Sequence, residues 1–211
     1  MAERRDALRN RAQLVAAAAD VFREQGVGAP LDAVARRAQV GRATLYRHFP
    51  DRGALLAAVL EDRVATLEDF AAEHEGEDLL ERLMVEMCWY QADVPGLVAA
   101  VNESAVENER LAAVTSRTLA LLRDAHGVAL RRGALRPDVT VDDVLLTTAM
   151  LAGVVSAREM PGGGVERALV LLLRGLRTEE HAAAPVPAAQ LRVRSTSNPK
   201  VLPEPAPDAV E

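Results

Sequence analysis

The 211-residue sequence predicts an all-α fold, with a three-helix helix-turn-helix domain at the N-terminus and a larger helical domain behind it. Apolar residues recur at helical spacing along the chain. No stretch of useful length alternates between apolar and polar residues in the way that a half-buried strand does. Glycine and proline interrupt the helical pattern repeatedly, which divides it into about nine helices.

The first helix is expected over residues 6–25. Leu8, Val15 and Phe22 are separated by seven residues each, which places them on one helical face. Gly26 follows directly, and glycine readily adopts the left-handed conformation that ends a helix. The segment therefore forms one amphipathic helix that packs by a single apolar side.

A helix-turn-helix pattern follows over residues 31–49. Two short helices are separated by a three-residue turn that ends in Gly41, the arrangement typical of this motif. Pro30 suits the first turn of the first short helix. Leu45 and Phe49 pack inwards from the second short helix, and Pro50 ends it.

The outward side of the second short helix has the chemistry of a DNA-reading element. It carries two guanidinium groups, a hydroxyl, a phenol and an imidazole. Such a helix fits the major groove, where guanidinium groups hydrogen-bond to guanine edges. An ordinary solvated helix is the alternative, because helix-turn-helix geometry alone is common. The candidate DNA-binding residues are Arg42, Ala43, Thr44, Tyr46, Arg47 and His48.

The distribution of charge favours the same interpretation. The net charge is −6, but residues 1–53 contain ten arginines and six acidic residues, a local charge of +4. The rest of the chain has 15 basic and 25 acidic residues, a charge of −10. A basic module on an acidic body is typical of a nucleic-acid-binding domain joined to another domain. Chance clustering of the arginines is the alternative.

The rest of the sequence predicts a helical second domain, which we call the body, followed by a tail. Thr140 and Asp143 form a capping-box pattern at the start of one helix. Six of the eleven prolines lie after residue 178, with few large apolar side chains, so residues 178–211 are expected to be disordered. The domains are thus residues 1–53, 54–177 and 178–211. Helices are expected at about residues 51–75, 78–92, 106–132, 140–159 and 165–177, with a short piece after Pro95.

Several classes of protein are excluded or disfavoured. No apolar run reaches the roughly eighteen residues that cross a bilayer, and no secretory signal is visible. The single cysteine, Cys88, cannot form an internal disulfide or a cysteine-rich metal site. The four histidines are scattered, without a nucleophile spacing or a phosphate-binding loop. We therefore expect a cytoplasmic protein that is not an enzyme, with no metal and no cofactor.

The last two expected helices have apolar residues on more than one side. Such helices are buried on two faces, one against their own core and one against a partner. Two-fold pairing would place two reading helices about one DNA turn apart, which predicts an inverted-repeat target. The alternative is that these are central helices of a monomer. The candidate interface residues are Val144, Leu151, Val155, Leu169, Leu172, Leu173 and Leu176.

The run VGRATLYRHFPDRGALL, residues 40–56, closely resembles the characteristic motif of the tetracycline-repressor (TetR) family. Residues 31–38 and the alanine-rich helix that ends in FREQG, residues 22–26, also resemble that family. The likeness covers about the first 65 residues, and the helical remainder fits only in length and number of helices. The resemblance implies a DNA-binding transcription regulator that pairs through its last two helices.

The resemblance also implies roles for individual residues. Thr44, Tyr46 and His48 stand where family members contact phosphates and bases. Arg42 and Ala43 occupy the variable positions that help to set sequence preference.

Two further arginines and two departures follow from the same comparison. Arg52 matches a basic residue that grips a phosphate at the start of the fourth helix, whereas Arg47 either contacts the backbone or is solvated. Gln39 stands where the family often has glycine, and it costs strain if its backbone is left-handed. Gly41 replaces the usual serine or threonine cap, which weakens the cap slightly.

Effectors of this family bind in a cavity of the second domain, which directs attention to residues 84–91. Methionine and aromatic side chains make an adaptable apolar lining, although plain core packing is the alternative for each of them. The candidate effector-pocket residues are Met84, Met87, Cys88, Trp89, Tyr90, Gln91, Asn102, Glu103 and Met150.

Taken together, these features predict a homodimeric repressor that a small-molecule effector releases from an inverted-repeat operator. Two alternatives stay open. One is a regulator without a small ligand, acting as an activator or controlled by a protein partner. The other is a small all-α enzyme or ligand carrier with an incidental basic end, which would lack the steep salt dependence of DNA binding.

Overall fold

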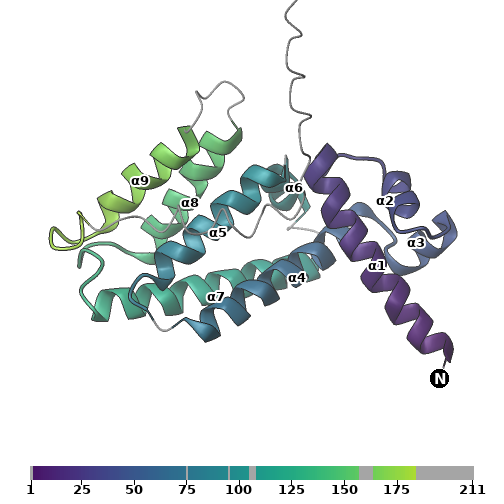
Figure 1. The fold of residues 1–211 in the computed structure, drawn as a ribbon, viewed down its shortest axis with the longest axis horizontal. Coiled ribbons are helices and arrows are strands. Elements are labelled where there is room, and N and C mark those ends of the chain that lie inside the picture. The colour runs from purple at the N-terminus through teal and green to yellow at the C-terminus, as the bar shows by residue number, and fades with distance from the viewer. Residues whose placement is uncertain (1, 75, 95, 105–107, 157–163, 184–211) are drawn as a thin grey trace, which may run out of the picture.

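The computed structural model describes residues 2–183 except 75, 95, 105–107 and 157–163. Over these residues the secondary structure consists of helices α1 to α9 and an isolated bridge between Leu135 and Arg177, which confirms the predicted all-α fold (Figure 1). The helices are α1 (Ala2–Gln25), α2 (Leu31–Arg37), α3 (Arg42–His48), α4 (Arg52–Glu73), α5 (Leu79–Asp93), α6 (Leu97–Ser104), α7 (Glu109–Arg131), α8 (Val141–Ser156) and α9 (Gly164–Leu176).

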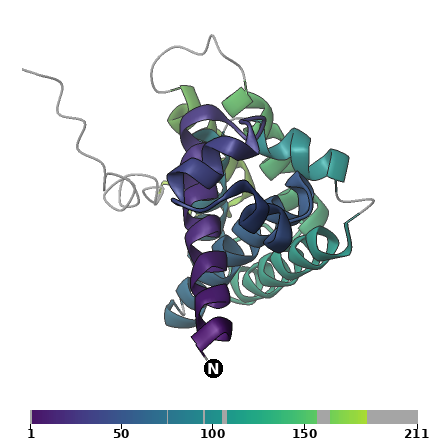
Figure 2. The same cartoon turned by 90° about the vertical axis from the view of Figure 1, so that its right-hand side faces the viewer.

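Helices α1, α2 and α3 form one end of the molecule, and Figure 2 views the structure from that end. Their apolar faces meet in a first core, in which Leu14, Phe22, Val34, Leu45 and Phe49 are buried. Leu45 and Phe49 face inwards from α3, as the apolar spacing predicts. The core fixes α3 on its inner side and leaves the other side of this short helix to solvent.

The turn between α2 and α3 is the place where the backbone departs from ordinary geometry. Gln39 has a φ of +57°, which lies in the left-handed region. Gly41 is the N-cap of α3 with an extended backbone and no side-chain hydrogen bond. Both departures noted in the sequence are therefore present, and the strain expected at Gln39 applies.

We expect Gln39→Gly to raise the free energy of unfolding by a few tenths to about 1 kcal/mol, because glycine adopts this φ without strain. Gln39→Val should lower it by about 1–2 kcal/mol, because a branched Cβ is least tolerated there. Urea unfolding measures both changes. Gly28→Ala is the matched control, since an added Cβ at Gly28 meets nothing within 4 Å. Equal stability of the glycine and valine variants would contradict the argument.

Helix α4 connects the two parts of the chain. It begins at a capped end, where Asp51 Oδ1 accepts a hydrogen bond of 2.7 Å from the amide of Ala54. Near this end Leu55 and Leu56 belong to the first core, whereas Leu67 near the other end belongs to a second core. One rigid helix thus couples the helix-turn-helix end to the body.

The body is built from α4, α5, α7, α8 and α9. In it α4 packs along α7, and α5 packs against α7 and α8. The predicted capping box is confirmed at the start of α8: Asp143 Oδ2 accepts from the amide of Thr140 at 2.8 Å, and the amide of Asp143 donates to Thr140 Oγ1 at 3.2 Å. The buried side chains of the second core include Leu83, Met84, Cys88, Leu122, Leu151, Leu169 and Leu173.

The end of α9 is tied to the body by a buried ion pair. Arg177 donates from Nε and Nη2 to the two carboxylate oxygens of Glu81, both at 2.5 Å. Beyond it, Thr178 Oγ1 donates to the carbonyl of Gly133 at 2.9 Å, and His181 Nε2 lies 3.4 Å from a carboxylate oxygen of Glu77.

These contacts correct one predicted boundary. The sequence predicts that residues 178–183 belong to a disordered tail, but Thr178 contacts the turn after α7 and His181 contacts Glu77, just before α5. Residues 184–211 lie outside the described part of the chain. None of the described helices is long and apolar enough to span a membrane.

Candidate nucleic-acid interface

Helix α3 presents a polar surface on a buried apolar base. Leu45 is 1% exposed, whereas Arg42, Ala43, Tyr46 and Arg47 are exposed. The other two predicted contact residues, Thr44 and His48, are half-buried. The structure therefore brings all six onto one short helix with four side chains directed outwards. Contact between these residues and DNA remains a prediction.

Arg42, the first residue of α3, is held by α2. Its Nε lies 2.8 Å from Asp32 Oδ1 in an ion pair. Asp32 carries no role in the sequence analysis, because nothing in a linear spacing of ten residues shows that the two side chains meet. The guanidinium is mostly exposed but has a partner on the neighbouring helix.

The C-terminal end of α3 lies beside α1. The guanidinium of Arg11 lies over the ring of Phe49, 5.3 Å from its centroid. His48 precedes Phe49, and its Nε2 is buried without a hydrogen-bond partner among the described residues. A second link between helices, in which Arg37 of α2 donates to both carboxylate oxygens of Glu24 of α1, fixes α2 in place.

Arg52 is held within the chain by two backbone acceptors. Its Nη1 donates to the carbonyl oxygens of Val27 and Ala29, the second at 2.7 Å, and the side chain is half-buried. The guanidinium thereby ties the loop between α1 and α2 to the start of α4. Arg52 thus has a structural contact that the resemblance does not imply, and its contact with a phosphate stays a prediction, since both of these hydrogen bonds use Nη1 alone.

Several of the predicted effector-pocket residues belong to the second core or pack against it. Met84 and Cys88 are fully buried in the second core, and Met87 and Trp89 pack partly buried against it. Burial raises the pKa of the Cys88 thiol to about 11, so it is protonated and unreactive at neutral pH. Core packing, the alternative to a pocket lining, describes these residues best.

Tyr90 and Gln91 differ from the core residues of α5. Tyr90 packs against the first core, with the guanidinium of Arg63 5.0 Å above its ring, and burial raises the pKa of its phenol. Arg63 Nη2 also donates to Glu86 Oε2 at 2.6 Å. The side-chain oxygen of Gln91 is buried without a hydrogen-bond partner among the described residues. This end of α5 therefore keeps an unused acceptor near α4.

Three further pocket candidates lie elsewhere. Glu103 is exposed on α6, and Met150 is 44% exposed on the outer side of α8, one residue from the buried Leu151. Both side chains lie at the surface and not beside the core residues of α5, and their contact with an effector stays a prediction. The side chain of Asn102 lies outside the described part.

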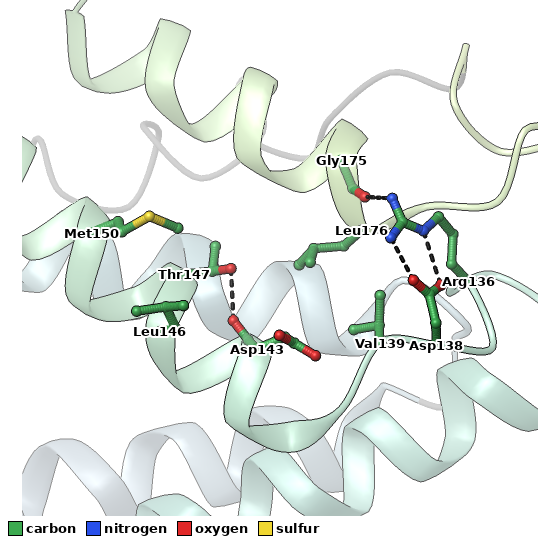
Figure 3. A pocket seen from close by; sticks show the side chains of 9 residues that line it. All are labelled: Arg136, Asp138, Val139, Asp143, Leu146, Thr147, Met150, Gly175 and Leu176. Atoms are coloured by element: carbon green, nitrogen blue, oxygen red, sulfur yellow. Dashed lines mark hydrogen bonds and ion pairs between the residues drawn. The ribbon is translucent and has the colours of Figure 1, made fainter.

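Met150 instead lines a surface pocket of about 260 Å³ between the ends of α8 and α9 (Figure 3). One wall is apolar, with Leu146, Met150 and Leu176. The other is closed by Arg136, which donates to the carbonyl of Gly175 at 2.9 Å and to both carboxylate oxygens of Asp138. Arg136 and Asp138 are thus paired with each other, whereas, among the described residues, the Asp143 carboxylate accepts only from the amide and hydroxyl of Thr140.

The predicted interface residues divide in the same way. Val144, Leu151, Leu169 and Leu173 are fully buried in the chain's own second core. They cannot touch a partner, so their assignment to an interface is corrected. Leu172 and Leu176 are half-buried, and the side chain of Val155 lies outside the described part.

The outward side of α8 is nevertheless apolar, and α9 exposes Leu171 with Arg167 and Arg174 on the same side. Leu146 is 59% exposed and Leu171 is 54% exposed. Leu146 and Met150 of α8 line the same surface pocket as Gly175 and Leu176 of α9, so the two outward sides adjoin. We name this surface the α8–α9 face; its exposed apolar residues are Leu145, Leu146, Met150 and Leu171.

Both a protein-family model and solved structures of other proteins are similar to this chain. A family model described as "Bacterial regulatory proteins, tetR family" matches residues 14–59, from the second half of α1 to the first part of α4. No curated protein matches the chain.

Similar solved structures cover about four-fifths of the chain. The crystal structure of a TetR transcriptional regulator from Streptomyces coelicolor is 31% identical, with a TM-score of 0.59, and the match covers 80% of this chain and 99% of that one. A TetR transcription regulatory protein from Mycobacterium vanbaalenii is 34% identical, with a TM-score of 0.55 and coverage of 83% and 99%.

Proposed function

The chain belongs to the TetR family of transcriptional regulators, which are DNA-binding proteins and not enzymes, and from this premise we propose that it is a homodimeric repressor acting on bacterial DNA in the cytoplasm. It binds an inverted-repeat operator through α3, dimerises through the α8–α9 face, and leaves the operator when a small-molecule effector binds to the body.

The observation that carries the DNA-binding part is the exposed polar side of α3 on a fixed base. The buried side chains of Leu45 and Phe49 anchor α3 in the first core. Arg11 of α1 lies over the Phe49 ring, and the Glu24–Arg37 pair joins α1 to α2. Four outward residues, Arg42, Ala43, Tyr46 and Arg47, are then free to enter a major groove. The local charge of +4 supports attraction to phosphates.

The α8–α9 face supports dimerisation. Contiguous apolar side chains on the surface of a monomer typically mark an interface. A two-fold axis through this face would use the same residues from both copies. It would also leave the α1–α3 end of each protomer free at the far end of the body (Figure 1).

Effector release is supported by the arrangement of α4 and α5. Gln91 Oε1 is a buried acceptor without a partner, a state that costs about 1–3 kcal/mol and that a ligand donor would relieve. Its neighbour Tyr90 stacks under Arg63 of α4, the helix that enters the DNA-binding end. A ligand that binds here with different affinities for two positions of α4 would shift the protein between them.

The decisive experiment is DNA selection and titration. The full chain is mixed with random double-stranded fragments, and recovered sequences are titrated at several salt concentrations. We expect an enriched inverted repeat whose affinity falls steeply with salt. A protein that enriches no sequence, or whose binding ignores salt, is not the proposed regulator.

Tyr46→Ala and Thr44→Ala should each weaken binding to the selected operator roughly 10- to 100-fold, because each removes contacts in the groove. Both side chains lie outside the core, so helicity by circular dichroism should stay unchanged. Arg123→Ala, an exposed change on α7 of the body, is the control and should bind normally. Unchanged affinity of both α3 variants would contradict the proposed reading surface.

A further inference from the structure

The ion pair between Asp32 and Arg42 joins the two helices of the helix-turn-helix on the side that faces solvent. Arg42 is 69% exposed and Asp32 is 34% exposed, and Arg42 Nε lies 2.8 Å from Asp32 Oδ1. Asp32 is itself well fixed, since it lies in the first turn of α2, whose other end is clamped to α1 by Arg37 and Glu24. The Asp32 carboxylate therefore has a fixed position and restrains the Arg42 side chain.

This carboxylate is unfavourable for general DNA binding. It adds a negative charge beside the surface that approaches phosphates, and it neutralises one of the arginines that would attract them. An exposed ion pair also stabilises the fold little. An acid in the first turn of α2 does stabilise that helix through its dipole, but this stabilisation does not depend on Arg42, whereas the ion pair fixes the geometry of Arg42.

The point of attachment determines what Arg42 can bind. A guanidinium has five N–H donors in a planar fork, and the Asp32 contact is made at the Nε side. The two terminal nitrogens remain at the exposed end, where they can donate in parallel. That pair matches the O6 and N7 acceptors of guanine in the major groove. A freely rotating arginine would instead distribute its donors among phosphates and other bases.

We propose that Asp32 is a positioning residue that orients Arg42 towards one guanine of each half-site, and so exchanges general affinity for sequence preference. The role rests on the function proposed for the chain, because it presupposes that α3 enters the major groove. Arg42 makes the base contact, and Asp32 acts through it.

The test compares sequence selection by the full chain and five variants, four single and one double. The wild type should enrich guanine at one position of each half-site, and Arg42→Ala should lose that preference roughly 10- to 100-fold. Asp32→Asn should lower the same preference at least fivefold while its affinity for mixed-sequence DNA stays equal or rises. Asp32→Glu, which keeps the charge but moves the carboxylate, should lower the preference without that rise.

Asp20→Asn is the matched control. Asp20 pairs with Arg23 on α1 at 3.0 Å and lies 3.9 Å from Arg37. The substitution therefore removes the same charge from the same domain without touching α3, and the shorter contact of Arg37 with Glu24, at 2.6 Å, stays in place. It should leave the guanine preference intact, and Asp32→Asn should add no further loss to Arg42→Ala. Full guanine preference in Asp32→Asn, or no loss in Arg42→Ala, overturns the inference while leaving the proposed function standing. A wild type that enriches no sequence overturns both.

Discussion

Replacing Glu81 by glutamine should lower the free energy of unfolding by about 3 kcal/mol, the largest effect expected from any conservative change in the chain. The carboxylate accepts from Nε and Nη2 of Arg177, both at 2.5 Å, and the pair is buried. Glu81→Gln leaves the Arg177 charge in the interior without its counter-ion, which typically costs about 3–5 kcal/mol. We expect the lower end of this range of unfolding free energies, because Arg177 Nη1 also donates to the carbonyl of His181 and keeps that hydrogen bond in the variant.

The exposed pair between Glu68 and Arg117 is the matched control. It also joins two helices through two short contacts, of 3.0 and 2.5 Å, but both side chains are about two-fifths exposed. Glu68→Gln should therefore cost less than about 1 kcal/mol. Urea unfolding followed by circular dichroism measures both variants. Similar losses for the two pairs would show that burial does not set the cost.

A double variant separates the charge from the packing. Changing both Glu81 and Arg177 to methionine removes both charges of the buried ion pair at once. The double variant should be more stable than Glu81→Gln alone, because two apolar side chains replace a buried ion pair at little net cost. A double variant as unstable as the sum of the two single changes would contradict this account.

The local features of the fold were predictable from the sequence because each depends on near neighbours. The inward positions of Leu45 and Phe49, the capping box at Thr140 and the strained turn at Gln39 all follow from residues within a few positions of one another. Helical spacing and turn chemistry act over that distance, so a linear pattern contains the information.

The choice between two apolar faces was not predictable in the same way. Periodicity shows that α9 has apolar residues on two sides, but not which side the chain itself buries. The structure buries Leu169 and Leu173 and exposes Leu171, and on α8 it buries Leu151 and exposes Leu146. Which face of a helix is buried depends on its packing against helices far away in the sequence, such as that of α5 against α8. The spacing of apolar residues within one helix does not show this contact.

Side-chain partners between distant segments were also missed. Arg52 lies at the start of α4, and nothing in the sequence shows that its guanidinium donates to the carbonyl oxygens of Val27 and Ala29. Glu81 and Arg177 are 96 residues apart and carry no local motif. Single charged residues become interpretable only when the fold shows which acceptors or donors surround them.

Placing two carboxylates on the α8–α9 face should convert the dimer to monomers. In the double variant Leu146→Glu and Leu171→Glu, a two-fold interface would bring four like charges together and bury them, at a cost of several kcal/mol. Sedimentation velocity should give a monomer at concentrations at which the wild type is a dimer. Both side chains are more than half exposed, so the protomer should keep its helicity.

Loss of the dimer should also be visible in DNA binding. A monomer engages one half-site at a time and loses the effective concentration that the second α3 supplies, so operator affinity should fall by roughly 100-fold or more. Leu8→Glu is the matched control, because Leu8 is an equally exposed leucine, 64%, at the other end of the molecule. It should remain dimeric, whereas Leu173→Glu should unfold the protomer since Leu173 is fully buried. A double variant that still sediments as a dimer would place the interface on another surface.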